Sequence, residues 1–134
     1  MNRAWLAAAL LFLVNDICAQ PAAPVLRTRN QRAFRTVIRE AAAKGPNFAD
    51  HYTIAQWGCG AGCVSMAVID SKTGRVDDGP FRILATETSE PLSFRLDSNL
   101  LTVRGCPEEK NCGAYFYEWT GSRFKLLRKT TARE

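Results

Sequence analysis

Residues 114–128 read AYFYEWTGSRFKLLR, in which two runs of strand-forming residues lie on either side of Gly121-Ser122. A two-residue connection that begins with glycine is typical of a type II′ β-hairpin, and it pairs Thr120 with Arg123. In this register, aromatic residues face apolar residues on one side of the hairpin and opposite charges meet on the other. The expected pairs are Trp119 with Phe124, Glu118 with Lys125 and Tyr117 with Leu126. The sequence therefore predicts an antiparallel hairpin near the end of the chain.

The chain between Pro46 and this hairpin contains further strand patterns, separated by turns rich in glycine, aspartate and serine. Short connections of this kind join antiparallel neighbours, so we expect a β-meander of about six to eight strands. The expected strands are His51–Trp57, Cys63–Asp70, Arg75–Val76, Phe81–Ala85, Leu92–Asp97, Leu100–Arg104, Ala114–Trp119 and Arg123–Arg128.

A single helix is expected before the strands. Asn30 is a plausible N-cap, and Gly45 followed by Pro46 would end the helix. The predicted fold class is α+β: one N-terminal helix packed on the antiparallel meander, with disulfide-braced loops, in a single domain over residues 30–134. The apolar face of the helix is formed by residues at helical spacing, namely Phe34, Val37, Ile38, Ala41 and Ala42.

Residues 1–19 have the pattern of a secretory signal peptide. Arg3 supplies the positive charge, and the apolar run Ala4–Val14 is shorter than the roughly 20 residues that a membrane-spanning helix needs. We expect cleavage after Ala19, which leaves no transmembrane segment and predicts an exported protein, periplasmic or secreted. Residues 20–29 contain two prolines and no clear periodicity, and are expected to form a flexible lead-in.

The chain has five cysteines, and cleavage of the signal peptide would remove Cys18. An even number of cysteines in an oxidising compartment predicts a disulfide framework. The spacing favours two local bonds, each bracing a loop between strands, and bonds between the two loops are the alternative. The four cysteines that would form these disulfides are Cys59, Cys63, Cys106 and Cys112.

The composition limits the class of protein. The chain has 134 residues, 46% of them hydrophobic and 23% charged, which excludes a disordered, collagen-like or multi-span membrane protein. The net charge of +5 belongs to the mature domain, because cleavage removes one basic and one acidic residue. A cluster of arginines could meet anionic lipid or polysaccharide headgroups, or form a solvated helix face. These residues are Arg27, Arg29, Arg32, Arg35 and Arg39.

The most distinctive stretch, residues 47–63, reads NFADHYTIAQWGCGAGC, and IDSKTG at 69–74 and DSNLL at 97–101 follow it. With these motifs the chain resembles a group of small exported bacterial proteins that share N-F-A-x-H-Y, W-G-C-G-x-x-C, an I-D-x-x-T-G turn and a D-S-x-L-L strand. The resemblance implies an envelope location and a small β-rich fold. It carries no assigned activity and therefore no catalytic residues. Asp50 stands where glycine is expected before the histidine.

Several chemical roles can be considered for His51 and the glycine-rich loop that follows. A Cys–His nucleophile pair or a redox-active Cys-x3-Cys requires a free thiolate, which a disulfide removes. A zinc site would favour paired Cys-x2-Cys spacing, and a phosphate loop would precede a helix, and neither pattern is present. We expect no catalytic, metal or cofactor-binding residues, and we identify a candidate binding loop. Its residues are His51, Trp57, Gly58, Gly60 and Gly62.

The aromatic residues Tyr115, Tyr117 and Trp119 share one face of a predicted strand. They could stack on sugar or peptide rings, but the apolar residues opposite them favour a place in the core.

These features predict an exported, non-catalytic module that binds an envelope macromolecule, as an inhibitor or immunity-type protein does. An anionic macromolecule is one candidate partner, and nucleic acid is not expected. One alternative is a small envelope enzyme or thiol-redox protein that uses His51 and the Cys59/Cys63 loop. Another is a structural module of the envelope with no ligand of its own.

Overall fold

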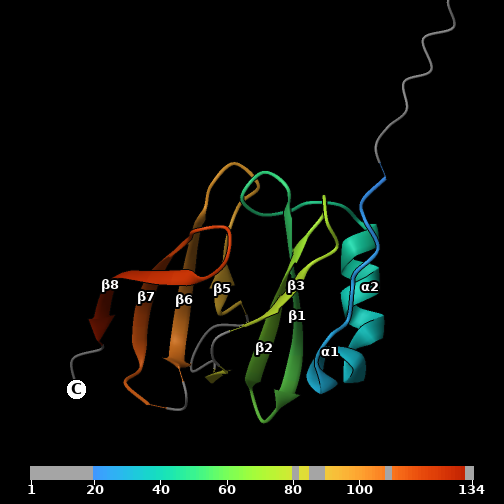
Figure 1. Ribbon diagram of the computed structural model, residues 1–134. Coiled ribbons are helices and arrows are strands. Elements are labelled where there is room, and N and C mark those ends of the chain that lie inside the picture. Colours follow the sequence, from blue (N-terminus) through green and yellow to red (C-terminus); the bar gives the residue numbers. More distant parts are fainter. Residues whose placement is uncertain (1–19, 80–81, 85–89, 108–109, 132–134) are drawn as a thin grey trace, which may run out of the picture.

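The computed structural model describes residues 20–79, 82–84, 90–107 and 110–131. The predicted signal peptide and its cleavage site before Gln20 fall on residues 1–19, outside the described part of the chain. Within the described residues, no helix is long and apolar enough to cross a membrane. The elements are α1 (Arg29–Ala33), α2 (Arg35–Ala43), β1 (Tyr52–Gly60), β2 (Cys63–Asp70), β3 (Val76–Asp78), β4 (Ile83–Leu84), β5 (Leu92–Ser93), β6 (Leu100–Pro107), β7 (Gly113–Trp119) and β8 (Phe124–Thr131) (Figure 1).

The strands form antiparallel pairs throughout, so the expectation of a mostly antiparallel β-structure with little helix is confirmed. The pairing order is β1-β2-β4-β6-β7-β8, with β3 beside β2 and β5 beside β6. β1–β3 and β5–β8 therefore form groups of three and four strands, and β4, only two residues long, connects them. This arrangement differs from the expected single meander, in which successive strands would be neighbours.

The segment Leu92–Asp97 shows why the meander does not form as expected. Only Leu92 and Ser93 pair with β6. Beyond them, the Leu96 carbonyl accepts a hydrogen bond from Asp50 N–H at 2.8 Å. A backbone group that bonds to the loop before β1 is not available to a strand ladder, so the strand ends early.

The predicted helix is divided in two at Phe34, whose φ of −106° and ψ of 24° are not helical. Thr28, not the expected Asn30, is the N-cap of α1. Thr28 and Gln31 form a capping box, in which each side chain accepts a hydrogen bond from the other residue's backbone N–H. The Thr-x-x-Gln pattern satisfies two N–H groups at once, which explains why the cap lies two residues earlier.

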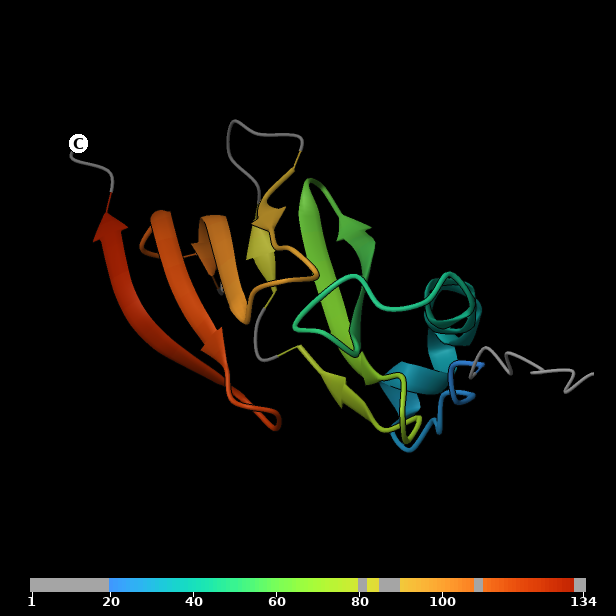
Figure 2. The ribbon, with the colours of Figure 1, turned by 90° about the horizontal axis from the view of Figure 1, so that it is seen from above.

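The two helices lie at one end of the molecule, next to β1–β3, and β8 lies at the other end (Figure 2). One buried cluster contains Ile38 and Ala42 from α2 together with residues of β1–β3, namely Ala55, Trp57, Ala67, Ile69 and Val76. A second cluster fills the space between the two groups of strands. It contains Phe48, Tyr52, Ile54, Met66, Val68, Ile83, Leu92, Leu101, Val103, Tyr115 and Trp119.

Residues 20–29, expected to be a flexible lead-in, are hydrogen-bonded to the turn between β2 and β3. Ala22 N–H donates to the Ser71 carbonyl and Val25 N–H to the Gly74 carbonyl, both at 2.8 Å. Gly74 has a φ of +78°, and a Cβ atom there would overlap the carbonyl oxygen of Ala23. The glycine therefore allows both the turn and the close approach of the lead-in.

Candidate functional site

The N-F-A-D-H-Y motif forms a tight turn before β1. Phe48 N–H donates to the Tyr52 carbonyl at 3.0 Å, and Tyr52 N–H donates to the Phe48 carbonyl at 2.9 Å. The Asn47 side chain holds the backbone of Ile54 by two hydrogen bonds, one to its carbonyl oxygen and one from its N–H. Asp50 has a φ of +74°, so the backbone adopts the left-handed conformation that glycine favours, although the residue is aspartate.

His51 lies between two carboxylates at the start of β1. Its Nδ1 is 3.4 Å from Asp50 Oδ2 and its Nε2 is 3.9 Å from Asp70 Oδ1, and 27% of its side chain is exposed. Ser71 Oγ donates to the backbone carbonyl of His51 at 2.6 Å, not to the imidazole ring. Each ring nitrogen of His51 therefore faces a carboxylate oxygen, whereas the Ser71 hydroxyl is bonded to the backbone and not to the ring.

The glycine-rich loop lies at the opposite end of β1 from His51. Cys59 lies eight positions after His51 along β1, roughly 26 Å at about 3.3 Å per residue. Cys59 is bonded to Cys63 across the hairpin that joins β1 to β2. The structure therefore does not bring the histidine and these sulfur atoms together, and both sulfurs are in a disulfide.

Trp57, predicted to belong to the binding loop, is 9% exposed. Its ring stacks on Phe34, with 4.7 Å between the ring centroids. Trp57 therefore packs under the helices, whereas Gly58, Gly60 and Gly62 remain at the hairpin, Gly60 and Gly62 with φ values of +94° and +78°.

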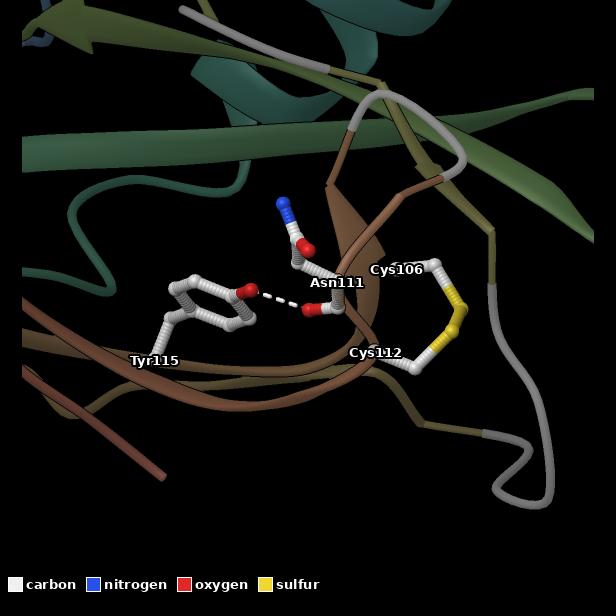
Figure 3. The surroundings of a disulfide bond; sticks show 4 residues. All are labelled: Cys106, Asn111, Cys112 and Tyr115. Atoms are coloured by element: carbon white, nitrogen blue, oxygen red, sulfur yellow. Dashed lines mark hydrogen bonds between the residues drawn. A yellow bond between two sulfur atoms is a disulfide. The ribbon is translucent and has the colours of Figure 1, made fainter. Parts of the chain in front are cut away.

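The second disulfide, Cys106–Cys112, closes the connection between β6 and β7 (Figure 3). The Tyr115 hydroxyl donates to the carbonyl oxygen of Asn111 beside it, as Figure 3 shows. The bonded cysteines are four and six residues apart in the sequence, so the expectation of local pairing is confirmed.

The aromatic face of β7 lies in the core. Tyr115 and Trp119 are buried, and Tyr117 is half-buried. The pairs of the hairpin are those predicted: Tyr117 with Leu126, Glu118 with Lys125 and Trp119 with Phe124. Tyr115 and Trp119 therefore belong to the buried core cluster, and Tyr117 packs against it.

The arginines before and within the helices are all exposed. Arg29 and Arg32 lie three residues apart in α1, and Arg35 and Arg39 lie four residues apart in α2, so each pair shares one side of its own helix. We call these four residues the arginine face. In the described part of the chain, none of them forms an ion pair with a carboxylate. A hollow of 330 Å³ adjoins Arg39, between α2 and residues 20–24.

A second basic region lies on β8, which the sequence reasoning did not single out. Residues 123–131 contain four basic side chains and no acidic one: Arg123, Lys125, Arg128 and Lys129. The absence of acidic residues is visible in the sequence, but the position of the strand at the edge of the sheet is not.

Comparisons with protein-family models, with curated proteins and with solved structures found no match to this chain. Over the described residues, no group of three or more histidine, cysteine, aspartate or glutamate side chains is placed to hold a metal ion. The fold places His51 beside the carboxylates of Asp50 and Asp70, and it bonds Cys59 to Cys63. The histidine and the disulfide lie at opposite ends of β1.

Proposed function

We propose that this protein is an exported, non-catalytic module that binds an anionic envelope macromolecule through the arginine face. The observation that carries the proposal is the set of four exposed arginines without a carboxylate partner among the described residues. The two disulfides are compatible with an oxidising compartment outside the cytoplasm.

The chemistry of arginine supports an anionic partner. A guanidinium group donates two parallel hydrogen bonds to a phosphate or carboxylate, and its charge does not depend on physiological pH. The helical backbone beneath these side chains is held in place, because Ile38 and Ala42 are buried against the strands. Two arginines are also oriented, since Arg32 donates to the Arg27 carbonyl at 2.8 Å and Arg35 to the Arg32 carbonyl at 3.2 Å.

The enzymatic alternative is less well supported. An enzyme or thiol-redox protein built on His51 and the Cys59/Cys63 loop would need these groups together, with at least one free thiolate. They lie at opposite ends of β1, and the cysteines are bonded to each other. A structural module without a ligand is the other alternative, and a binding measurement separates it from the present proposal.

The test uses residues 20–134 and two anionic probes. These are vesicles of phosphatidylcholine with and without phosphatidylglycerol, and immobilised heparin as an acidic polysaccharide. We expect binding to at least one probe that weakens as salt is added. Arg32→Gln together with Arg35→Gln should weaken binding to anionic vesicles about 30-fold, because each basic residue contributes about 1 kcal/mol at such a surface.

The matched control is Lys125→Gln with Lys129→Gln, which removes the same charge from the opposite end of the molecule. Binding by this control should stay within about twofold of the unmodified protein, because screened charges act over about 10 Å. The absence of salt-dependent binding to both probes would contradict the proposal. Equal losses in the two double variants would show a general charge effect and would contradict the assignment to the arginine face.

A further inference from the structure

The strand β8 forms one end of the pairing order, and its only strand neighbour is β7 among the described residues. It is eight residues long and exposed along most of its length. Leu126 and Leu127 have 46% and 50% of their surface exposed. Figure 2 shows β8 at the side of the molecule farthest from the helices. A strand in this position presents backbone donors and acceptors that another chain can use.

The register of the hairpin shows which backbone groups are open. Thr120 N–H donates to the Arg123 carbonyl at 3.0 Å, which makes these two residues a hydrogen-bonded pair. Antiparallel pairs alternate from Arg123 to Leu126, up to the register shift at Leu127, so over this stretch the N–H and C=O groups of Phe124 and Leu126 point away from β7. The partner strand β7 shows the same alternation. Trp119, opposite Phe124, donates its N–H away from β8, to the Asn99 carbonyl on the β6 side at 2.8 Å.

The charges of β8 favour one class of occupant. The strand and the residue before it carry four basic side chains and no acidic one. Lys125 is paired with Glu118, and the Arg128 guanidinium lies 4.4 Å from the centroid of the Phe116 ring. The side chains of Lys125 and Arg128 therefore lie along the sheet surface, beside the open edge. A second copy of β8 would place like charges opposite one another, which destabilises a strand pair, whereas acidic side chains would be attracted.

We propose that the open edge of β8 binds an extended, acidic polypeptide segment, which pairs with it as an added strand. Backbone hydrogen bonds to Phe124 and Leu126 would position the segment. The basic side chains of β8 would select acidic residues, and Leu126 and Leu127 would contact apolar residues between them. This site is separate from the arginine face and lies at the opposite end of the molecule.

The probe is an octapeptide that alternates glutamate and valine, acetylated and amidated at its ends. Backbone amide exchange is measured by NMR on residues 20–134, with and without the peptide. We expect exchange to slow about tenfold or more at Phe124 and Leu126, because their N–H groups become bonded. The Lys125 N–H, which already faces β7, should be unaffected. A matched peptide that alternates lysine and valine should have no effect.

Two variants of one residue separate strand pairing from simple attraction of charge. Leu126→Pro removes the open N–H, whereas Leu126→Ala shortens the side chain and keeps that N–H. Proline is tolerated on an edge strand where the N–H faces solvent. We expect Leu126→Pro to weaken peptide binding about tenfold relative to Leu126→Ala, as the loss of a hydrogen bond predicts. Circular dichroism and urea unfolding establish that each variant is folded.

A charge variant provides the test if Leu126→Pro does not fold. Lys125→Glu with Lys129→Glu should lose the glutamate peptide and acquire binding to the lysine peptide. Unchanged amide exchange with saturating glutamate peptide would overturn the proposal. Equal binding by the two Leu126 variants, with heparin competing fully, would also overturn it in favour of a general polyanion surface. Protection of these amides by protein concentration alone would identify a second copy as the occupant. The vesicle measurements on the arginine-face variants use neither peptide nor heparin and are independent of these outcomes.

Discussion

The ring of Phe34 stacks on the ring of Trp57, with 4.7 Å between the centroids and 22° between the planes. Phe34 is the residue at which α1 ends and α2 begins, and Trp57 lies in β1. The break between the helices therefore coincides with a contact to the sheet. In an uninterrupted helix, Phe34 would have helical φ and ψ. Its observed φ of −106° and ψ of 24° are not helical, and in this conformation its ring stacks on Trp57.

Replacement of Phe34 by alanine should lower the free energy of unfolding by about 2 kcal/mol, from lost apolar burial and the lost ring contact. Phe34→Leu keeps most of the apolar volume and should cost about half as much. Urea unfolding followed by circular dichroism measures both values. A loss below the error of the measurement for Phe34→Ala would show that the stack does not stabilise the domain.

Gly74 and Gly45 provide a matched pair of glycines, with φ values of +78° and +87°. Gly45→Ala should cost about 1 kcal/mol, the penalty for a left-handed residue that carries a Cβ, because no atom lies within 4 Å of the new group. Gly74→Ala should cost more, since its Cβ would also collide with the Ala23 carbonyl. Faster exchange of the Val25 amide in Gly74→Ala would locate the damage at residues 20–25. Equal costs for the two variants would contradict this packing.

Asp50 adopts a φ of +74°, and its side chain is 89% exposed. Asp50→Gly should therefore raise the free energy of unfolding by about 0.5–1 kcal/mol, because relief of the left-handed strain exceeds the added flexibility of the unfolded chain. The pair with His51 is exposed on the aspartate side and contributes little. Asp50→Ala removes the same carboxylate but keeps the Cβ, and should not stabilise the protein. Thermal unfolding of both variants compares these effects.

The cysteine pairs predict a thiol count. Protein without residues 1–19 should show no reactive thiol in denaturant before reduction, because Cys59–Cys63 and Cys106–Cys112 are bonded. Mild reductant should then release thiols in pairs. Cys59→Ser with Cys63→Ser should lower stability by about 2 kcal/mol, the value for a short closed loop. Two free thiols in the oxidised, denatured protein would contradict the bonded state and would favour the redox alternative.

Burial raises the pKa of Tyr117 above its ordinary value of 10.0, and the neighbouring Tyr115 adds to the shift. The folded state therefore holds this phenol proton more tightly than the unfolded chain. The stabilisation is present below the unfolded pKa and is lost as pH rises through the higher folded pKa. Urea unfolding between about pH 9 and pH 11 should show stability falling with pH, and Tyr117→Phe should reduce that slope. An unchanged slope in Tyr117→Phe would contradict this assignment.

Local interactions made parts of the fold predictable. The register of the β7–β8 hairpin follows from Gly121-Ser122 and its flanking pairs, and the bounds of β2 follow from its apolar run. Cysteines four and six residues apart can meet within one loop, so both disulfides could be expected. The end of the helical segment at Gly45 is equally local, because this glycine follows the last turn with a φ of +87°.

Other features depended on contacts between distant parts of the chain. The early end of β5 depends on Asp50, more than 40 residues earlier, whose N–H bonds to Leu96. The sequence placed His51 and the Cys59–Cys63 loop in one motif, but an extended strand carries them to opposite ends. A period-2 pattern identifies a strand without saying which strands will be its neighbours.

The sequence by itself determined the short-range structure of this protein: its terminal hairpin, its local disulfides and the basic character of its helical segment. Only the tertiary structure decided that residues 20–29 pack on the turn at Gly74, and that β8 is an edge with open N–H groups at Phe124 and Leu126. The physical reason is the range of the interactions. Turn geometry and ring closure act over a few residues, whereas strand order follows from burial of the whole core.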